Sequence, residues 1–388
     1  MSQPAPIGID LGTTNSLIAT AQAGEFEVLT NDHGGQKTPS VLSYDWDAKA
    51  VHVGHTARNR SVSHPSDTIH SIKRWMGTEE MFALGPDEYR PEAISALILQ
   101  QLRRDAAEAL GRDVTNAVIT VPAYFTDRER KATKKAGEIA GLTVDRIITE
   151  PTAACLAYGL GAASSETVFV YDLGGGTFDC SLVELRDGMI DVLGVDGATD
   201  LGGDDYDGLV VEWLCERIAE EYGSRPARDS PEVESRLFDA ARTAKHELSS
   251  RTSTKISLPY LELADGDTVT VEQQLGRDVF EQLVGGPTEE TLAISRDLLA
   301  KLDVPPTAVD RVLLVGGSTQ MPIVSDAVTD LFDQSPEQGL DPDLVVALGA
   351  AAQSCIIHDR EIPAASSTDG LPAAETPGSG GVIDNDSQ

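Results

Sequence analysis

Apolar residues recur at helical spacing in three long segments of the chain, residues 91–110, 127–140 and 231–250. Gly111 and Gly141 follow the first two segments, at the position where a glycine commonly ends a helix. The third segment combines an apolar stripe with charged residues, as in a helix that covers a core with one face. The pattern therefore predicts helices over these three segments.

Apolar runs elsewhere in the chain predict buried strands. Residues 117–121 form one such run, which ends at Pro122, and residues 312–315 form another. Two further segments, residues 7–19 and 168–183, each indicate a strand, a turn of glycine and small hydroxyl residues, and a second strand. Both contain Asp-Leu-Gly at the end of the first strand, so the chain carries an internal repeat. Strands that alternate with helices, together with this repeat, predict a mixed α/β fold with two similar lobes.

The chain is strongly acidic. Its 388 residues include 63 acidic and 30 basic side chains, which gives a formal charge of −33, and the basic residues comprise 21 arginines and only 9 lysines. This charge disfavours a nucleic-acid binder, because a polyanion is normally met by a basic patch. An acidic surface poor in lysine suits concentrated salt, where the Debye length falls to about 3 Å at 1 M. We therefore expect a halophilic protein, and the alternative is an ordinary acidic protein of the cytosol.

Several features predict a cytoplasmic protein. The N-terminal residues lack a basic and apolar leader, and no apolar run approaches the length that spans a membrane. The four cysteines lie far apart with no CxxC pair, which is typical of reduced, buried thiols. From about residue 361 the chain has no apolar period, so we expect a disordered tail over residues 361–388.

The two glycine-rich turns are the candidate chemical site. Turns of this kind present backbone N–H groups that can bind phosphate. Asp10 and Asp172 end the strands before the turns, and Asp179 follows the second turn; carboxylates near phosphate suit Mg²⁺. The alternatives are ordinary hairpins and turn-capping aspartates. No GxxxxGK[ST], GxGxxG, HExxH or EF-hand pattern occurs, which disfavours P-loop NTPases, dinucleotide-binding dehydrogenases and metal hydrolases.

The motifs of the chain resemble, in order and spacing, the nucleotide-binding domain of the heat-shock protein 70 (DnaK) family of chaperones. The resemblance covers residues 7–358 and rests on the blocks IGIDLGTTNS (7–16), IKR (72–74), VITVPAYF (118–125), EPTAA (150–154), DLGGGTFD (172–179), LGGDD (201–205) and VGGS (315–318). Within the family, the blocks KRWMG and GGSTQMP look most like the HscC-like subgroup.

The resemblance implies an actin-like ATPase fold of the α/β class, with two ribonuclease-H-like lobes around a nucleotide cleft. The implied lobe I covers residues 1–165, with an outer subdomain at about 38–113. The implied lobe II covers residues 166–360, with an outer subdomain at about 206–285 and a final helix, 344–357, that returns to lobe I.

Site residues carry over from the family by position. The phosphates of ATP or ADP would lie between two turns, Gly12, Thr13, Thr14 and Asn15 on one side and Gly174, Gly175, Gly176 and Thr177 on the other. Asp10 and Asp172 would orient the water ligands of Mg²⁺, and K⁺ is a further ion that the resemblance allows. The implied catalytic residues are Lys73, Glu150, Asp179 and Thr177, of which Lys73 and Glu150 would place the attacking water and the phosphate.

The adenosine side of the implied site comes from later segments. Its residues would be Arg242, Lys245 and Ser249, on one helix face, together with Gly316, Gly317, Ser318 and Asp343. Without the surrounding motifs, Arg242 and Lys245 would indicate only a solvated helix face. His246 and Gln320 stand where many family members have arginines around the adenine, so we expect poorer stacking and lower affinity.

The resemblance also implies partners. Pro122 and Arg130 match the family's proline and arginine that relay between the cleft and the domain surface, and Arg146 matches a J-protein contact. A J-domain co-chaperone at the surface of Arg130 and Arg146 and a nucleotide-exchange factor are the implied partners; the alternative is a solvated helix flank around Arg130. Thr149 replaces the usual asparagine, which weakens the expected J-protein coupling. No leucine-rich linker follows residue 357, so we expect a chain without the family's peptide-binding domain, and a monomer.

The function predicted from these observations is a chaperone-type, Mg-dependent ATPase that hydrolyses ATP slowly to ADP and phosphate. Two alternatives stay open. The first is a nucleotide-dependent interaction module with little turnover. The second is a small-molecule kinase of the same superfold, which shares the two phosphate turns.

Overall fold

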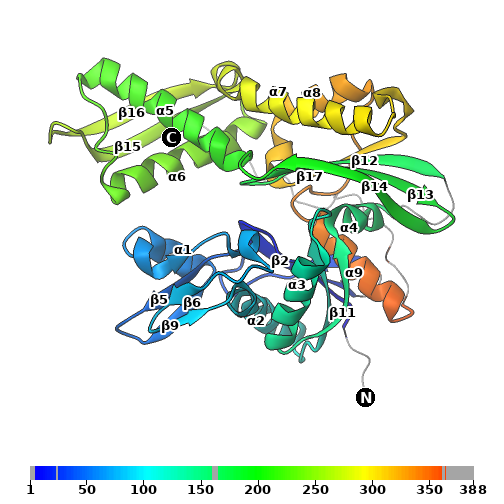
Figure 1. Ribbon diagram of the computed structural model, residues 1–388. Coiled ribbons are helices and arrows are strands. Elements are labelled where there is room, and N and C mark those ends of the chain that lie inside the picture. Colours follow the sequence, from blue (N-terminus) through cyan, green and yellow to red (C-terminus); the bar gives the residue numbers. More distant parts are fainter. Residues whose placement is uncertain (1–4, 23–24, 160–164, 361–362, 364–388) are drawn as a thin grey trace, which may run out of the picture.

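Two β-sheets form the framework of the molecule (Figure 1). The computed structural model describes residues 5–22, 25–159, 165–360 and 363. The first sheet has, in spatial order, β11 (Thr143–Thr149), β10 (Asn116–Val121), β1 (Ile7–Asp10), β2 (Asn15–Gln22) and β3 (Glu25–Val28), with β4 (Thr38–Pro39) also paired to β2. The second sheet has β14 (Met189–Ala198), β13 (Phe178–Arg186), β12 (Glu166–Leu173) and β17 (Arg311–Val315).

Each sheet is built around one copy of the predicted repeat. In the first, β1 pairs antiparallel with β2 and parallel with β10. In the second, β12 pairs antiparallel with β13 and parallel with β17 in the same way. The strands predicted at residues 117–121 and 312–315 are β10 and β17, so they occupy equivalent places beside the two repeats. The repeat and both strands are confirmed.

Three small sheets lie outside this framework. Their strands are β6 (Ala50–Val53), β5 (Leu42–Asp45) and β7 (Thr68–Ile69) in one, β8 (Phe82–Leu84) and β9 (Asp87–Tyr89) in the next, and β15 (Ser253–Glu262) and β16 (Thr268–Gly276) in the last. Figure 1 shows the first and last of them on the two facing halves of the molecule, beside α1 (His55–Ser61) and α6 (Pro231–Ser250) respectively.

The helices of the described chain begin and end close to the predicted positions. Residues 91–110 form α2 (Pro91–Leu110), and residues 231–250 form α6. The third predicted helix is α3 (Asp127–Ile139), which ends one residue earlier than predicted. Gly111 and Gly141 both have positive φ angles, 62° and 82°, as the left-handed end of a helix requires. The remaining helices are α4 (Glu150–Ala157), α5 (Gly203–Tyr222), α7 (Arg277–Lys301), α8 (Pro322–Phe332) and α9 (Val345–Ile357).

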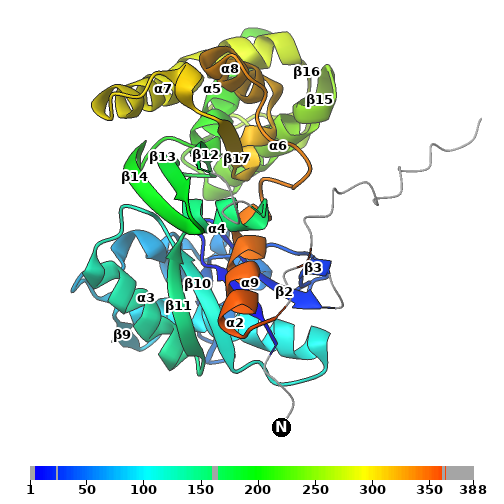
Figure 2. The same cartoon turned by 90° about the vertical axis from the view of Figure 1, so that its right-hand side faces the viewer.

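A shared core joins the two halves. One cluster of buried residues lies behind each sheet, and a third contains residues of both sheets together with α4 and α9. Helix α9 comes last in the described chain but contacts β1, β2 and β10 of the first sheet, as Figure 2 shows. Its residues 345–355 are all buried. The last helix therefore packs on the first sheet, and α4, which contacts α9, also contacts the strands of the second sheet.

Some expectations lie at the limits of the described chain. The predicted lobe boundary near residue 165 falls beside residues 160–164, which lie outside the described residues, and the lobe and subdomain boundaries stay predictions. The predicted tail at 361–388 also lies outside the described residues, apart from Pro363. No helix of the described ranges combines the length and the apolar character needed to cross a membrane.

Candidate functional site: a cleft between two phosphate-type turns

The two glycine-rich turns line one cavity from opposite sides. Gly12, Thr13, Thr14 and Asn15 contribute from the connection between β1 and β2, and Gly174, Gly175, Gly176 and Thr177 from the connection between β12 and β13. The second turn is closed by a hydrogen bond from the Gly174 N–H to the Thr177 carbonyl oxygen, 3.0 Å long. Arg74 also reaches across, because its Nη2 donates to the Gly176 carbonyl oxygen at 3.0 Å. The structure thus brings the residues of both predicted turns together.

The second turn is supported by a motif to which the sequence assigned no role. The Gly203 N–H donates to the Gly174 carbonyl oxygen at 3.0 Å, and the Asp204 N–H donates to that of Gly175 at 2.6 Å. A Cβ at Gly202 would lie 2.7 Å from the Gly175 backbone, so only glycine fits there. The LGGDD block therefore holds the turn in place. The two consecutive glycines before a helix were the available signal for this contact.

Five carboxyl groups and two ammonium groups line the same cavity: Asp10, Asp172, Asp179, Glu150 and Asp343, with Lys37 and Lys73. Burial, followed by the charge of Glu150, raises the pKa of Asp10 to about 6 and that of Asp179 to about 7. The same two causes raise the pKa of Asp172 well above its usual range. Asp172 and Asp179 are also direct neighbours in the register of β12 and β13, where like charges repel. The cavity therefore holds more carboxyl groups than its two lysines can neutralise.

Lys73 and Glu150 form a nearly buried ion pair. Their Nζ and Oε1 atoms are 2.6 Å apart, and their side chains are 8% and 13% exposed. Lys73 comes from a 3₁₀ helix, Ile72–Trp75, and Glu150 is the first residue of α4. Burial acts against the charged form of Lys73, but the carboxylates of Glu150 and Asp10 outweigh it, so the pKa of Lys73 is raised. The ammonium is therefore charged and fixed in direction.

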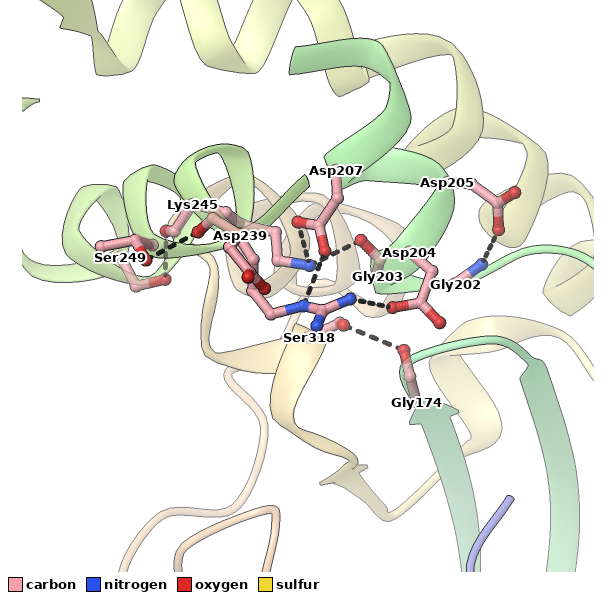
Figure 3. A network of polar contacts seen from close by, with 12 residues as sticks. Gly174, Gly202, Gly203, Asp204, Asp205, Asp207, Asp239, Lys245, Ser249 and Ser318 are labelled. Atoms are coloured by element: carbon pink, nitrogen blue, oxygen red, sulfur yellow. Dashed lines mark hydrogen bonds and ion pairs between the residues drawn. The ribbon is translucent and has the colours of Figure 1, made fainter. Parts of the chain in front are cut away.

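Two of the predicted adenosine residues, Arg242 and Lys245, line a neighbouring cavity and are bonded to residues of helix α5 (Figure 3). The guanidinium of Arg242 donates to Asp207 and Asp204, each at 3.0 Å. The ammonium of Lys245 lies 2.7 Å from the buried Asp207 carboxylate and donates to the Gly203 carbonyl oxygen at 2.5 Å. These contacts fix the two cations at the edge of the cavity. No sequence pattern identified Asp204 and Asp207 as the partners of Arg242 and Lys245.

Ser249 lines the same cavity, as do Gly317, Ser318 and Asp343. The Ser249 hydroxyl donates to the Lys245 carbonyl oxygen at 3.3 Å. The Ser318 hydroxyl donates to the Gly174 carbonyl oxygen at 2.9 Å, which ties this segment to the second turn. Gly316 and Gly317 line the cavity between the turns, Gly317 lines both cavities, and Asp343 lies against Gly317. The structure therefore brings all seven predicted adenosine residues to one side of the phosphate-type turns.

The predicted partner residues lie away from this cleft. Arg130, on α3, is half-buried and donates to the carbonyl oxygens of Phe125 and Ala123, at 3.0 and 3.4 Å. Its guanidinium thus braces the loop that follows Pro122, which itself lines the cleft. Arg146, on β11, is exposed. Thr149 caps α4, because its hydroxyl accepts a hydrogen bond from the Thr152 N–H at 3.3 Å.

Comparison with known proteins places this architecture in a family. The family model described as Hsp70 protein matches residues 6–84 and 80–364. The chaperone protein DnaK from each of two strains of Halobacterium salinarum is 46% identical over 358 residues, which is 92% of this chain and 56% of the relative. The chain thus spans about half the length of the curated relatives it matches. Both relatives are DnaK proteins, so the HscC-like assignment stays a prediction, whereas their source agrees with the salt adaptation expected from the acidic composition. The chain belongs to the Hsp70 family and has the actin-like fold of that family.

Proposed function

We propose that this chain binds Mg-ATP in the cleft and hydrolyses it slowly to ADP and phosphate, as the ATPase unit of a DnaK-like chaperone. The observation that carries the proposal is one cavity in which both glycine-rich turns, the Lys73–Glu150 pair and four further carboxyl groups meet. Phosphoryl transfer to water depends mainly on positioning and on neutralising charge, and these groups supply both.

Each group has a definite task in this proposal. The backbone N–H groups of the turns hold the phosphate oxygens, with residues 12–15 on one side and 174–177 on the other. Lys73 directs its charge at the transferring phosphoryl group, and Glu150 orients the attacking water and accepts its proton. Asp179 and Thr177, whose side chains share a hydrogen bond, position the same water from the opposite half.

The residues present fit a magnesium ion. Burial, followed by the charge of Glu150, raises the pKa values of Asp10 and Asp172, and a divalent cation beside these carboxyl groups would favour their charged forms. Within the described ranges, no group of three or more His, Cys, Asp or Glu side chains is arranged to bind a metal directly. Two carboxylates acting through water ligands suffice for Mg²⁺, which would contribute charge neutralisation at the phosphates. We extend the proposal to K⁺ as a second ion of the same acidic cavity.

The proposed adenosine contacts follow from the second cavity. Arg242, Lys245 and Ser249 would flank the base and ribose from α6, and residues 316–318 with Asp343 would face them. Burial and the adjacent Lys245 lower the pKa of His246, so this ring is neutral at pH 7. A neutral imidazole stacks on adenine without the cation–π attraction of an arginine. We therefore propose modest nucleotide affinity.

We also propose a J-domain co-chaperone and a nucleotide-exchange factor as partners, with the surface around Arg130 and Arg146 as the J-domain contact. We assign the protein to the cytoplasm, as a monomer. All four cysteines are buried and free of disulfides, which is typical of proteins in a reducing compartment.

Single-turnover ATP hydrolysis in about 2 M KCl tests the proposal. Lys73→Ala should slow hydrolysis about 100-fold, the effect of removing one group that stabilises a transition state, and leave ATP binding within a few-fold. Lys255→Ala removes an exposed, ion-paired lysine on β15 and is the matched control. Unchanged hydrolysis in the Lys73 variant would refute the assigned role. ATP binding by the unmodified chain without turnover would instead favour the interaction module, and phosphorylation of a sugar or acetate the kinase.

A further inference from the structure

Two cations line the cavity between the turns in the described part of the chain, and the mechanism uses only one of them. Lys73 lines this cavity and forms a nearly buried ion pair with Glu150. Lys37 lines the same cavity and also the adenosine cavity beside it. Its side chain is 44% exposed, so the ammonium can change partners at low cost. Its place between the two cavities is where the phosphate chain of a bound nucleotide would join the ribose.

The backbone of Lys37 is held beside the first turn. Its carbonyl oxygen accepts a hydrogen bond from the Asn31 amide at 2.9 Å and lies 3.1 Å from the His55 ring nitrogen Nε2. The next residues form β4, which pairs with Asn15 and Ser16 directly after the turn. The Ser40 N–H then donates to the Thr14 carbonyl oxygen at 2.9 Å. The backbone of Lys37 is therefore anchored beside the first turn, and its exposed side chain can change direction about this fixed point.

The ammonium of Lys37 forms an ion pair with the carboxylate of Asp343, on the other side of the cleft. The same carboxylate accepts a hydrogen bond from the Gln320 amide at 3.3 Å, and it lies directly over Gly317. Asp343 is one of the residues proposed to face the nucleoside. The Asp343 carboxylate, a candidate acceptor for a ribose hydroxyl, is therefore paired with the ammonium of Lys37, which lies beside the phosphate-type turns.

We propose that Lys37 is a phosphate-binding residue of the cleft, which exchanges Asp343 for a phosphate oxygen next to the ribose when a nucleotide binds. The inference rests on the proposed nucleotide function and adds to it a residue that no family motif contains. The exchange leaves the Asp343 carboxylate free to accept a hydrogen bond from a ribose hydroxyl. In its new position the Lys37 ammonium also reduces the electrostatic repulsion between the Asp343 carboxylate and the bound phosphates.

The test compares ADP with adenosine, since the two differ only in the phosphates. Isothermal titration in about 2 M KCl gives the phosphate preference, defined as the Kd of adenosine divided by the Kd of ADP. Lys37→Gln should lower this preference about tenfold, through weaker ADP binding, as expected for the loss of one charged contact. Lys37→Arg should keep it within a few-fold. Asp343→Asn should keep or raise it, because Lys37 then has no competing carboxylate.

Lys255→Gln is the matched control, because this lysine is also ion-paired, with Glu272 at 2.8 Å, but lies on β15. An unchanged phosphate preference in Lys37→Gln would overturn the proposal. An equal weakening of ADP and adenosine in both Lys37→Gln and Asp343→Asn would also overturn it, because that result indicates a pair that only ties the two halves together. Absence of ADP binding by the unmodified chain would instead refute the proposed function itself.

Discussion

A close contact between helices α9 and α4 allows a direct test of the packing beneath the cleft. At Gly349 the helix lies so close to α4 that an added Cβ would be 1.8 Å from the Ala153 carbonyl oxygen. Favourable contacts between heavy atoms require about 3.5–4.0 Å, so the two helices would have to separate by roughly 1.5–2 Å. Both belong to the core that joins the two sheets, which is too densely packed to yield easily.

Gly349→Ala should therefore destabilise the protein although alanine is the better helix former. The gain in helix propensity is about 1 kcal/mol, and overpacking costs about 1–3 kcal/mol or more when backbone atoms clash. Because the contact is with backbone that cannot rotate away, the overpacking cost should reach the upper end of this range, about 3 kcal/mol, and we expect a net loss of about 2 kcal/mol or more. Urea unfolding at constant KCl concentration, followed by circular dichroism, gives this difference from the change in midpoint.

Gly208→Ala is the matched control, because Gly208 also lies within a helix, α5, and its added Cβ would meet no heavy atom within 4 Å. This variant should be more stable than the parent chain by about 0.5–1 kcal/mol. If Gly349→Ala proved as stable as Gly208→Ala, the close approach of α4 and α9 would be wrong, and with it the account of how the two halves are joined.

Two further predictions concern charge. Burial raises the pKa of Asp105, on α2, to about 6, and one of its carboxylate oxygens is buried without a hydrogen-bond partner among the described residues. The folded state therefore binds a proton that the unfolded state releases, so this residue reduces stability as the pH rises from about 4 to 6. Asp105→Asn should raise the unfolding free energy by about 1–3 kcal/mol at pH 7 and by much less at pH 4, and an equal gain at both pH values would contradict the assignment. The formal charge of −33 predicts that the urea midpoint of the parent chain rises between about 0.5 and 3 M KCl, because salt screens self-repulsion; a constant or falling midpoint would refute salt adaptation.

The sequence by itself predicted the features that depend on neighbouring residues. Helical periodicity located α2 and α6 to the residue, and the glycines after α2 and α3 marked their ends. The repeated Asp-Leu-Gly pattern identified the two strand–turn–strand units. These patterns succeed because backbone conformation and the burial of one face are set by residues a few positions apart.

Only the tertiary structure decided which charges meet. Lys37 and Asp343 are 306 positions apart, and no local pattern relates them. The sequence left open whether Arg242 and Lys245 contact a nucleotide or lie on a solvated helix face. In the structure both form ion pairs with Asp207 on helix α5. Likewise, the raised pKa of Asp172 follows from burial, from the charge of Glu150 and from a strand register that places Asp179 beside it. Partner choice and burial arise when distant segments pack together, because the energy of a charge depends on everything around it and not on its neighbours along the chain.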